Sequence, residues 1–225
     1  MNLQLSTHEI RVIGCLIEKA ITTPDQYPLS VNALTNACNQ KSNRDPVMNL
    51  DERTVQETVD SLVKKHLVLE KSGFGSRVPK YQHRFCNTGF GSFEFTPQAT
   101  AVLCELMVRG PQTPGELRGR ASRMAEIHDV NEVETILQAL ATRADGPFVV
   151  RLPREPGRRD SRYAHLFGGP IDPSLLVETE PTEQEPTRGA SLAERVTQLE
   201  HLVEQLRAEV EGIKNGRESG VGDRE

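Results

Sequence analysis

The fold is decided by residues 51–85, which read DERTVQETVDSLVKKHLVLEKSGFGSRVPKYQHRF. The first half of this stretch has its apolar residues at the spacing of one helix face, at Val55, Val59, Leu62 and Val63. A short apolar run, a glycine-rich segment and a second alternating run follow, which is the pattern of a β-hairpin. A helix followed by such a hairpin is how a winged helix-turn-helix ends, with the hairpin as the wing.

The same unit recurs later in the chain. The segment KYQHRF at residues 80–85 is echoed by RYAHLF at residues 162–167, each a cation followed by Tyr-x-His-x-Phe. A second helical stripe precedes the echo, at Val133, Ile136, Leu137 and Leu140. Two copies of one unit are the economical interpretation. We therefore expect an α+β, mostly helical fold with two tandem winged helix-turn-helix domains, at residues 5–88 and 95–168.

Capping residues mark where the expected helices begin. Ser6 with Glu9 and Thr113 with Glu116 have the spacing of capping boxes, and Thr96-Pro97 combines a cap with a proline in the first turn. The two copies differ between their second and third helices. Leu34 and Val55 are 21 positions apart, whereas Leu117 and Val133 are 16 apart, so the first copy has five extra residues in this turn.

A different composition follows the two copies. Residues 169–190 are rich in proline and acidic side chains, which predicts a disordered linker. Residues 191–214 form a heptad pattern with valine mostly at a and leucine mostly at d, which favours a parallel two-stranded coiled coil. We expect a homodimer through this helix, and the alternative is a frayed amphipathic tail or a helix packed on the body. The seam is Leu192, Val196, Leu199, Val203, Leu206 and Val210.

Charge and cysteine content narrow the classes of protein. The net charge of −5 is uneven, since residues 1–169 hold 21 Lys and Arg against 19 Asp and Glu, and residues 170–225 hold 6 against 13. The body is thus near neutral and lacks the strongly basic balance typical of nucleic-acid binding. No apolar run is long enough to span a membrane, and four scattered cysteines favour buried thiols in a reducing cytoplasm.

Residue patterns for catalysis are missing from the sequence. The histidines and cysteines have no metal-ligand spacing, and no nucleophile motif or phosphate loop is present. The repeated Tyr-x-His-x-Phe favours a packed strand face with the imidazole hydrogen-bonded at the edge. We therefore expect no enzyme, no cofactor and no metal.

Two surfaces of the second copy suit DNA. Opposite the buried stripe of its third helix lie short neutral donors and acceptors that can read base edges in a major groove: Asn131, Thr135, Gln138 and Thr142. The wings carry a net charge of +3 each, and cations there can reach phosphates beside that groove: Arg151, Arg154, Arg158 and Arg159, with Arg77 and Lys80 in the first copy. The alternatives are an ordinary solvated helix face and solubilising loop charges.

The extended turn of the first copy is a third candidate. It gathers amides and cations that suit a phosphate or an acidic partner: Asn39, Gln40, Lys41, Asn43 and Arg44. Unusual loops often carry function. The alternative is that these side chains are exposed to solvent and bind no partner.

Two segments resemble a known family. CNQKSNRDPV at residues 38–47 and GFGSRVPKY at residues 73–81 are similar to the bacterial YceH-like proteins, a family treated as a domain of unknown function. The resemblance covers about residues 5–168 and implies two tandem winged-helix domains. It implies no reaction, ligand or partner, and the acidic linker and heptad tail lie outside it.

Two functions from different classes fit these observations. The first is a cytoplasmic DNA-binding protein with a regulatory role, in which a dimer sets two half-sites and the second copy reads bases. The second is a protein–protein interaction module that uses the winged-helix surfaces without DNA. Two basic wings beside a polar helix face favour the first.

Overall fold

The computed structural model describes residues 3–71, 78–89, 91, 93–155, 157–169 and 171. Contacts within the chain divide it into two units, residues 1–178 and 179–225, and every described residue belongs to the first. The predicted helix at 191–214, nearly all of the predicted linker, and Arg77 lie outside the described residues. The linker, the coiled coil and the dimer therefore stay predictions.

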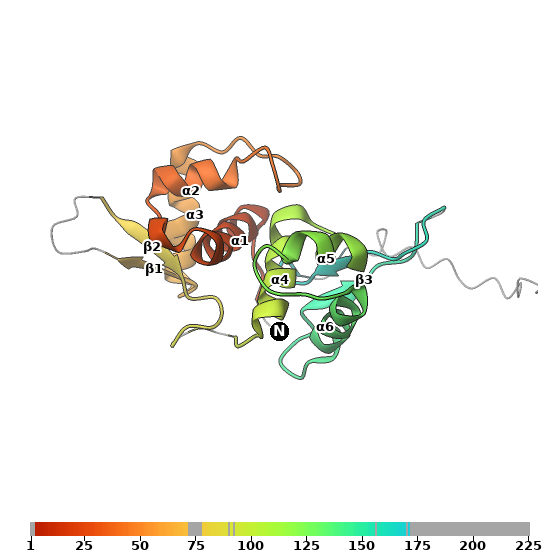
Figure 1. The fold of residues 1–225 in the computed structure, drawn as a ribbon. Coiled ribbons are helices and arrows are strands. Elements are labelled where there is room, and N and C mark those ends of the chain that lie inside the picture. The colour runs from red at the N-terminus through yellow and green to blue at the C-terminus, as the bar shows by residue number, and fades with distance from the viewer. Residues whose placement is uncertain are drawn as a thin grey trace, which may run out of the picture. The chain divides into compact units, whose positions relative to one another are not determined.

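The described part of the chain is an α+β structure with six α-helices and two small antiparallel sheets (Figure 1). This class confirms the sequence-based prediction. The first half contains α1 (Thr7–Thr22), the 3-10 turn η1 (Pro24–Gln26), α2 (Val31–Cys38), α3 (Glu52–Lys64), β1 (Val68–Lys71) and β2 (Lys80–His83). The second half contains α4 (Pro97–Arg109), α5 (Pro114–Ala121), α6 (Val130–Thr142), β3 (Val149–Arg151) and β4 (Tyr163–His165).

Side-chain caps start the helices where the sequence predicted. The Ser6 hydroxyl accepts a hydrogen bond from the Glu9 amide (3.2 Å), and the Glu9 carboxylate accepts one from the Ser6 amide (2.8 Å). Thr113 and Glu116 form the same reciprocal pair at α5. These bonds satisfy backbone N–H groups that have no partner within the helix. Both predicted capping boxes are confirmed.

The two halves repeat the same backbone hydrogen bonds. Each half pairs its two strands antiparallel, with Val68 opposite His83 in the first sheet and Val149 opposite His165 in the second. A single residue before the second helix extends each sheet by one bridge. Leu29 exchanges two backbone hydrogen bonds with Tyr81 (2.7 and 3.1 Å), and Gln112 exchanges two with Tyr163 (2.8 and 3.0 Å). The repeat inferred from sequence thus extends to equivalent backbone contacts.

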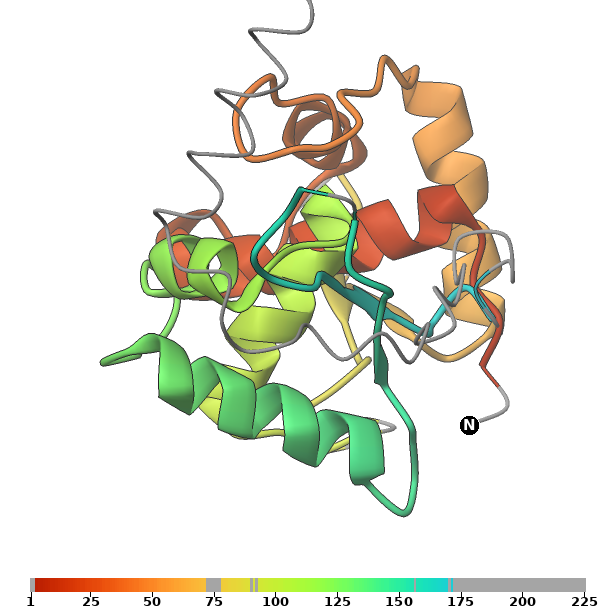
Figure 2. The same cartoon turned by 90° about the vertical axis from the view of Figure 1, so that its right-hand side faces the viewer.

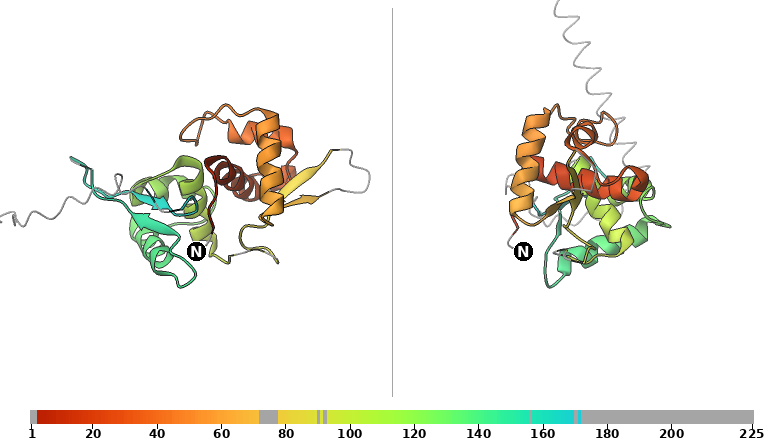
Figure 3. Two further views of the ribbon diagram at one scale, coloured as in Figure 1. Left: turned by 180° about the vertical axis from the view of Figure 1, so that it is seen from behind. Right: turned by 90° about the vertical axis from the view of Figure 1, so that its left-hand side faces the viewer.

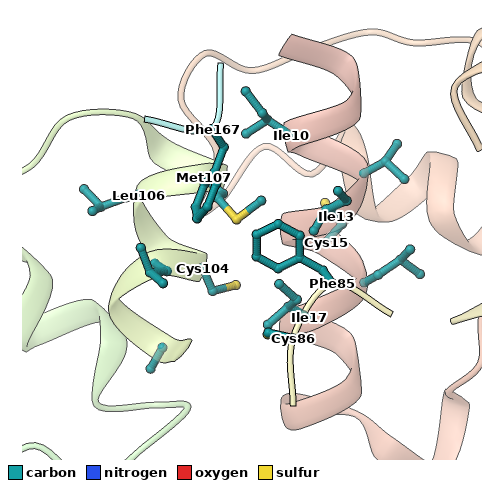
Figure 4. Close-up of a cluster of buried hydrophobic side chains, with 14 of the residues drawn as sticks. Ile10, Ile13, Cys15, Ile17, Phe85, Cys86, Cys104, Leu106, Met107 and Phe167 are labelled. Carbon is teal, nitrogen blue, oxygen red and sulfur yellow. The ribbon is translucent and has the colours of Figure 1, made fainter. Parts of the chain in front are cut away.

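One hydrophobic core runs through both halves. Helix α1 packs on α4, and Figure 4 shows Ile13 and Ile17 of α1 facing Cys104 and Met107 of α4, with Phe85 between them. The Phe85 ring also meets that of Phe167, with centroids 5.0 Å apart. The two halves therefore bury apolar surface against each other. The predicted domain boundaries at 88 and 95 stay predictions, because no observation places a boundary there.

The echoed Tyr-x-His-x-Phe segments pack largely as expected, apart from their imidazoles. Tyr81, Phe85 and Phe167 are buried. The prediction that the imidazoles are hydrogen-bonded stays a prediction, although Nδ1 of His83 and Nδ1 of His165 are buried without a partner among the described residues. Burial lowers the pKa of each imidazole to about 4, because a charged ring would be poorly solvated there.

The two β-hairpins project from opposite ends of this unit (Figures 1 and 3). The β3–β4 hairpin lies beside α6, which packs against α4 and β3. The packing of α6 on α4 and β3 thus fixes the outer surfaces of α6 and of this hairpin relative to each other.

The close approach of α1 and α4 predicts opposite effects for two identical glycine substitutions. A Cβ atom on Gly14 would lie 2.8 Å from Val108 Cγ1 and 3.1 Å from Met107 Cβ, whereas one on Gly119 of α5 meets nothing within 4 Å. We expect Gly14→Ala to lower the free energy of unfolding by about 1–3 kcal/mol, because the core is overpacked. We expect Gly119→Ala to raise it by about 0.5–1 kcal/mol through helix propensity. Denaturant unfolding measures both, and equal effects would contradict the tight packing of α1 on α4.

The buried imidazoles of His83 and His165 predict a loss of stability in mild acid. The folded pKa of about 4 lies below the ordinary value of 6.5, so this stability is complete above pH 6.5 and is lost as pH falls toward 4. We expect His83→Gln and His165→Gln each to reduce the slope of unfolding free energy against pH in this window. His128→Gln, at an exposed position, is the control and should leave the slope unchanged. An unaltered slope in both buried variants would show that other groups cause the acid sensitivity.

Candidate nucleic-acid interface

The outer face of α6 is open to solvent. The Asp129 carboxylate caps the helix by accepting a hydrogen bond from the Glu132 amide (2.9 Å). Val133, Leu137 and Leu140 are buried against the core, and the residues opposite them are all exposed, as the sequence predicted: Asn131, Thr135, Gln138 and Thr142. Figure 2 shows α6 along one edge of the unit.

A shallow depression lies between α6 and the second sheet. It is lined by Glu134, Thr135, Gln138, Ala139 and Thr142 of the helix, with Arg151 and Tyr163 of the strands. The structure thus brings three of the four predicted base-reading residues together with one of the predicted phosphate-binding arginines. Asn131 lies on the same helix face but does not line the depression.

The polar side chains that line this depression differ in the hydrogen bonds that they can still form with a ligand. The hydroxyls of Thr135 and Thr142 donate to the carbonyls of Asn131 and Gln138 (both 2.9 Å), so their oxygens remain as acceptors. The Gln138 amide bonds no described residue and can both donate and accept. An amide of this kind can make a bidentate contact with adenine in a major groove.

The segment between β3 and β4 presents arginines to solvent. Arg151, Arg154, Arg158 and Arg159 are all exposed. Glu155 is shared by Arg158 (3.6 Å) and Arg162 (3.4 Å) in ion pairs that stay largely exposed. Arg151, Arg154 and Arg159 form no ion pair with any residue of the described ranges. Within the described ranges, this hairpin therefore keeps a positive charge that no neighbouring acid neutralises.

The first half offers a poorer surface for DNA. On the outer face of α3, Arg53 pairs with Glu57 (2.9 Å) and the Gln56 amide donates to Asp60 (2.7 Å). Lys80 is exposed at the turn end of the β1–β2 ladder, opposite Lys71. The helix face of this half is thus occupied by its own acids, unlike that of α6.

The extended turn of the first half faces inward at two of its five candidate residues, which corrects the prediction for them. The Arg44 side chain is fully buried and donates to both carboxylate oxygens of Glu18 (3.1 and 2.5 Å). The Asn43 amide donates to Glu18 (3.3 Å) and to Glu105 of α4 (3.2 Å). A phosphate or an acidic partner cannot reach the buried Arg44 side chain, and the half-buried Asn43 amide is engaged by two carboxylates. The long turn is used inside the protein.

The other three residues of that turn lie nearer the surface. The Asn39 side chain exchanges hydrogen bonds with the backbone of Leu50 (2.7 and 2.8 Å) and so fixes the shape of the turn. Gln40 accepts a bond from Lys19 (3.5 Å), and Lys41 is exposed. Among the five candidate residues, Gln40 and Lys41 are thus the two that remain for contact with a partner.

Residues that the sequence reasoning missed complete a buried network between the halves. Arg123, which follows α5, bonds Glu18 of α1 and lies 2.9 Å from Glu105 of α4. Burial alone would raise the pKa of Glu18, but hydrogen bonds and charge from Arg44 and Arg123 outweigh it and lower that pKa to about 2. Apolar residues around Glu18 and Glu105 were the only sequence signal, since each interrupts a buried helical stripe.

No group of three or more His, Cys, Asp or Glu residues within the described ranges could hold a metal ion. The four cysteines are free and buried, as the sequence predicted for Cys15 and Cys104. None of the described helices is both long and apolar enough to cross a membrane.

Comparison with known proteins shows the family. Residues 5–158 match the family model described as "Protein of unknown function, DUF480". The chain belongs to this family. Among similar proteins, the UPF0502 protein of Aeromonas hydrophila is 54% identical over 94% of this chain and 95% of its own length. The UPF0502 protein YceH of Escherichia fergusonii is 51% identical over 95% of this chain and 97% of its own length. The resemblance to YceH-like proteins is thereby confirmed.

The buried network predicts a large difference between two arginine variants. We expect Arg44→Leu to lower the free energy of unfolding by about 3–5 kcal/mol, because it leaves buried carboxylates without their main counter-charge. Arg53→Leu removes an exposed ion pair of α3 and should leave stability unchanged within error. Denaturant unfolding at neutral pH compares the two. A small loss in Arg44→Leu would show that the network is dispensable.

Proposed function

We propose that the protein is a non-enzymatic, cytoplasmic DNA-binding protein, with a regulatory role, built from two tandem winged helix-turn-helix units. The observation that carries the proposal is the depression in which Thr135, Gln138 and Thr142 lie beside Arg151. A base-reading helix face and a basic hairpin meet there on one surface. The buried free thiols are compatible with a reducing compartment.

The repeated topology supports the winged-helix part of the proposal. Each half has three helices followed by a two-stranded hairpin, and the residue before its second helix adds one more bridge to that sheet. In a helix-turn-helix, the second helix of the pair enters the major groove. Helix α6 corresponds to that recognition helix in the second half, and α3 does so in the first.

The side chains of α6 and of the β3–β4 hairpin suit two different kinds of contact with DNA. Short neutral side chains on α6 would contact base edges, and arginines on the hairpin would contact phosphates. The acid-paired face of α3 assigns this role to the second half alone. Pairing of two copies through the predicted heptad helix would present two such sites and multiply a weak single contact.

A protein–protein interaction module is the second candidate. Residues 1–169 carry a net charge of only +2, and Glu132 and Glu134 flank the reading face of α6. Val47 on the long turn is 55% exposed. These features favour a protein partner if DNA is not bound.

The proposal predicts salt-dependent binding of the full chain to random duplex DNA. We expect log K to fall linearly with log salt, because arginines that contact phosphates release counterions. Arg158→Ala/Arg159→Ala should reduce that slope by up to about 1.8, at about 0.9 per lost phosphate contact. Fluorescence anisotropy across a salt series measures both.

The matched control removes two exposed cations from the first half. Arg53→Ala/Lys64→Ala changes the net charge equally and should leave the slope unchanged. No binding at low salt would reject the DNA-binding proposal and leave the interaction module. An equal change of the salt slope in both double variants would mean that DNA binding depends only on the net charge of the protein.

A further inference from the structure

A hollow of about 250 Å³ lies between the end of α1, the η1 turn and α2 in the first half. Its apolar lining is Leu29, Ala33 and Ala37, of which Leu29 and Ala37 are buried. The polar side chains that complete the lining are Lys19, Thr23, Gln26, Asn36 and Gln40. The hollow shares no residue with the depression beside α6, so it is separate from the proposed DNA surface.

The second copy of the repeat covers the equivalent face with longer side chains. The helix caps Ser30 and Thr113 align the two copies, and the single-residue bridges just before them agree with that alignment. In this alignment, the apolar residues of the hollow, Leu29, Ala33 and Ala37, correspond to Gln112, Glu116 and Arg120. The Arg120 guanidinium donates to the Gln112 side chain and pairs with Glu116 (3.5 Å). Shorter, apolar side chains thus leave this face open in the first copy.

The one cation that lines the hollow has no acceptor at ordinary hydrogen-bond distance among the described residues. The Lys19 side chain is only 18% exposed, yet its Nζ lies 3.7 Å from Glu18 Oε2 and 3.5 Å from Gln40 Oε1. Ordinary N–H···O bonds measure about 2.7–3.2 Å. Glu18 is already paired with Arg44 and Arg123. Because an ammonium group has three donors, Lys19 can still bond an anion that enters the hollow.

The other polar groups of the hollow suit a carboxylate. Among the described residues, no acidic side chain lines it. The Gln26 side chain forms no hydrogen bond within the described ranges, and the Asn36 amide donates only a long bond to Asn32 (3.4 Å). Amide N–H groups can donate to a carboxylate without adding charge. A single lysine is a compact point charge, which matches one negative charge better than the two of a phosphate.

We propose that this hollow binds a small organic monoanion, a carboxylate with a short apolar chain. The carboxylate bonds Lys19 and the amides of the rim, and the apolar chain lies on Leu29 and the two alanines. Sites for drug-sized ligands have volumes of about 300–1,000 Å³. The smaller hollow therefore fits a metabolite of a few carbon atoms. This inference does not rest on DNA binding, because the two surfaces have no residue in common.

The test titrates four probes into the full ¹⁵N-labelled chain at constant ionic strength. The probes are butyrate, acetate, the uncharged butyramide and inorganic phosphate, and the readout is the side-chain NH₂ resonances of Gln26, Asn36 and Gln40. We expect butyrate to shift these resonances to saturation in the millimolar range. Acetate should bind about fivefold or more weakly, because it lacks the two methylene groups that reach the apolar lining. Butyramide and phosphate should not saturate.

Two variants test the charge and the space separately. Lys19→Met keeps the length of the side chain and should weaken butyrate binding by about tenfold or more, because it removes a charged hydrogen-bond donor. Ala33→Leu keeps the charge, fills the hollow and should also abolish saturation. The matched control is Lys64→Met, which removes an exposed lysine of α3 and should leave butyrate binding unchanged. Thermal unfolding checks that all three variants are folded.

Several results would overturn the inference. Equal shifts with butyrate and butyramide, or saturation that survives in Lys19→Met, would show that Lys19 holds no carboxylate. Saturation that survives in Ala33→Leu would place the ligand outside the hollow, and tighter binding of phosphate than of butyrate would reject the carboxylate class. No saturable shift with either carboxylate would reject the site itself. None of these outcomes bears on the DNA-binding proposal, which is tested by a different measurement.

Discussion

The structure depends on the buried ion pair between Arg44 and Glu18. A charge removed from water is costly unless it is paired and hydrogen-bonded, and here the partners come from both halves. Glu18 belongs to α1, Arg44 to the long turn after α2, Glu105 to α4 and Arg123 to the segment after α5. The Asp45 amide also donates to the Val108 carbonyl (3.1 Å). Neither half by itself satisfies these groups, so the polar network and the apolar contact of α1 with α4 require the same arrangement.

The two copies of the repeated unit differ in the turn between their second and third helices. The first half has thirteen residues between its second and third helices and the second half has eight, and the extra length turns inward to supply Asn43 and Arg44. The second half has the shorter turn and leaves its helix face and hairpin arginines exposed. The long turn of the first half thus stabilises the contact between the halves, whereas the exposed helix face and arginines of the second half form the proposed DNA surface.

Much of this fold follows from local sequence. Helical spacing places Val133, Leu137 and Leu140 in the core, and cap residues mark the starts of α1 and α5. The comparison of two copies also located the five extra residues. Local patterns could not assign partners to Asn43 and Arg44, because Glu18 is 26 positions from Arg44 and Glu105 is 62 positions from Asn43. Leu29 and Gln112 each form a single bridge, which is too short to give an alternating pattern. The exposure of the α6 face was predictable, whereas the depression depends on how β3 packs beside it.

The contact of α1 with α4 joins the same element from each copy. Cys104 of α4 donates through its sulfur to the carbonyl of Gly14 in α1 (3.3 Å). An interface made by one patch and its own repeat has the geometry of an isologous homodimer. Because both copies lie on a single chain, dilution cannot separate them, and each could accumulate substitutions that a symmetric pair of identical subunits would have to share.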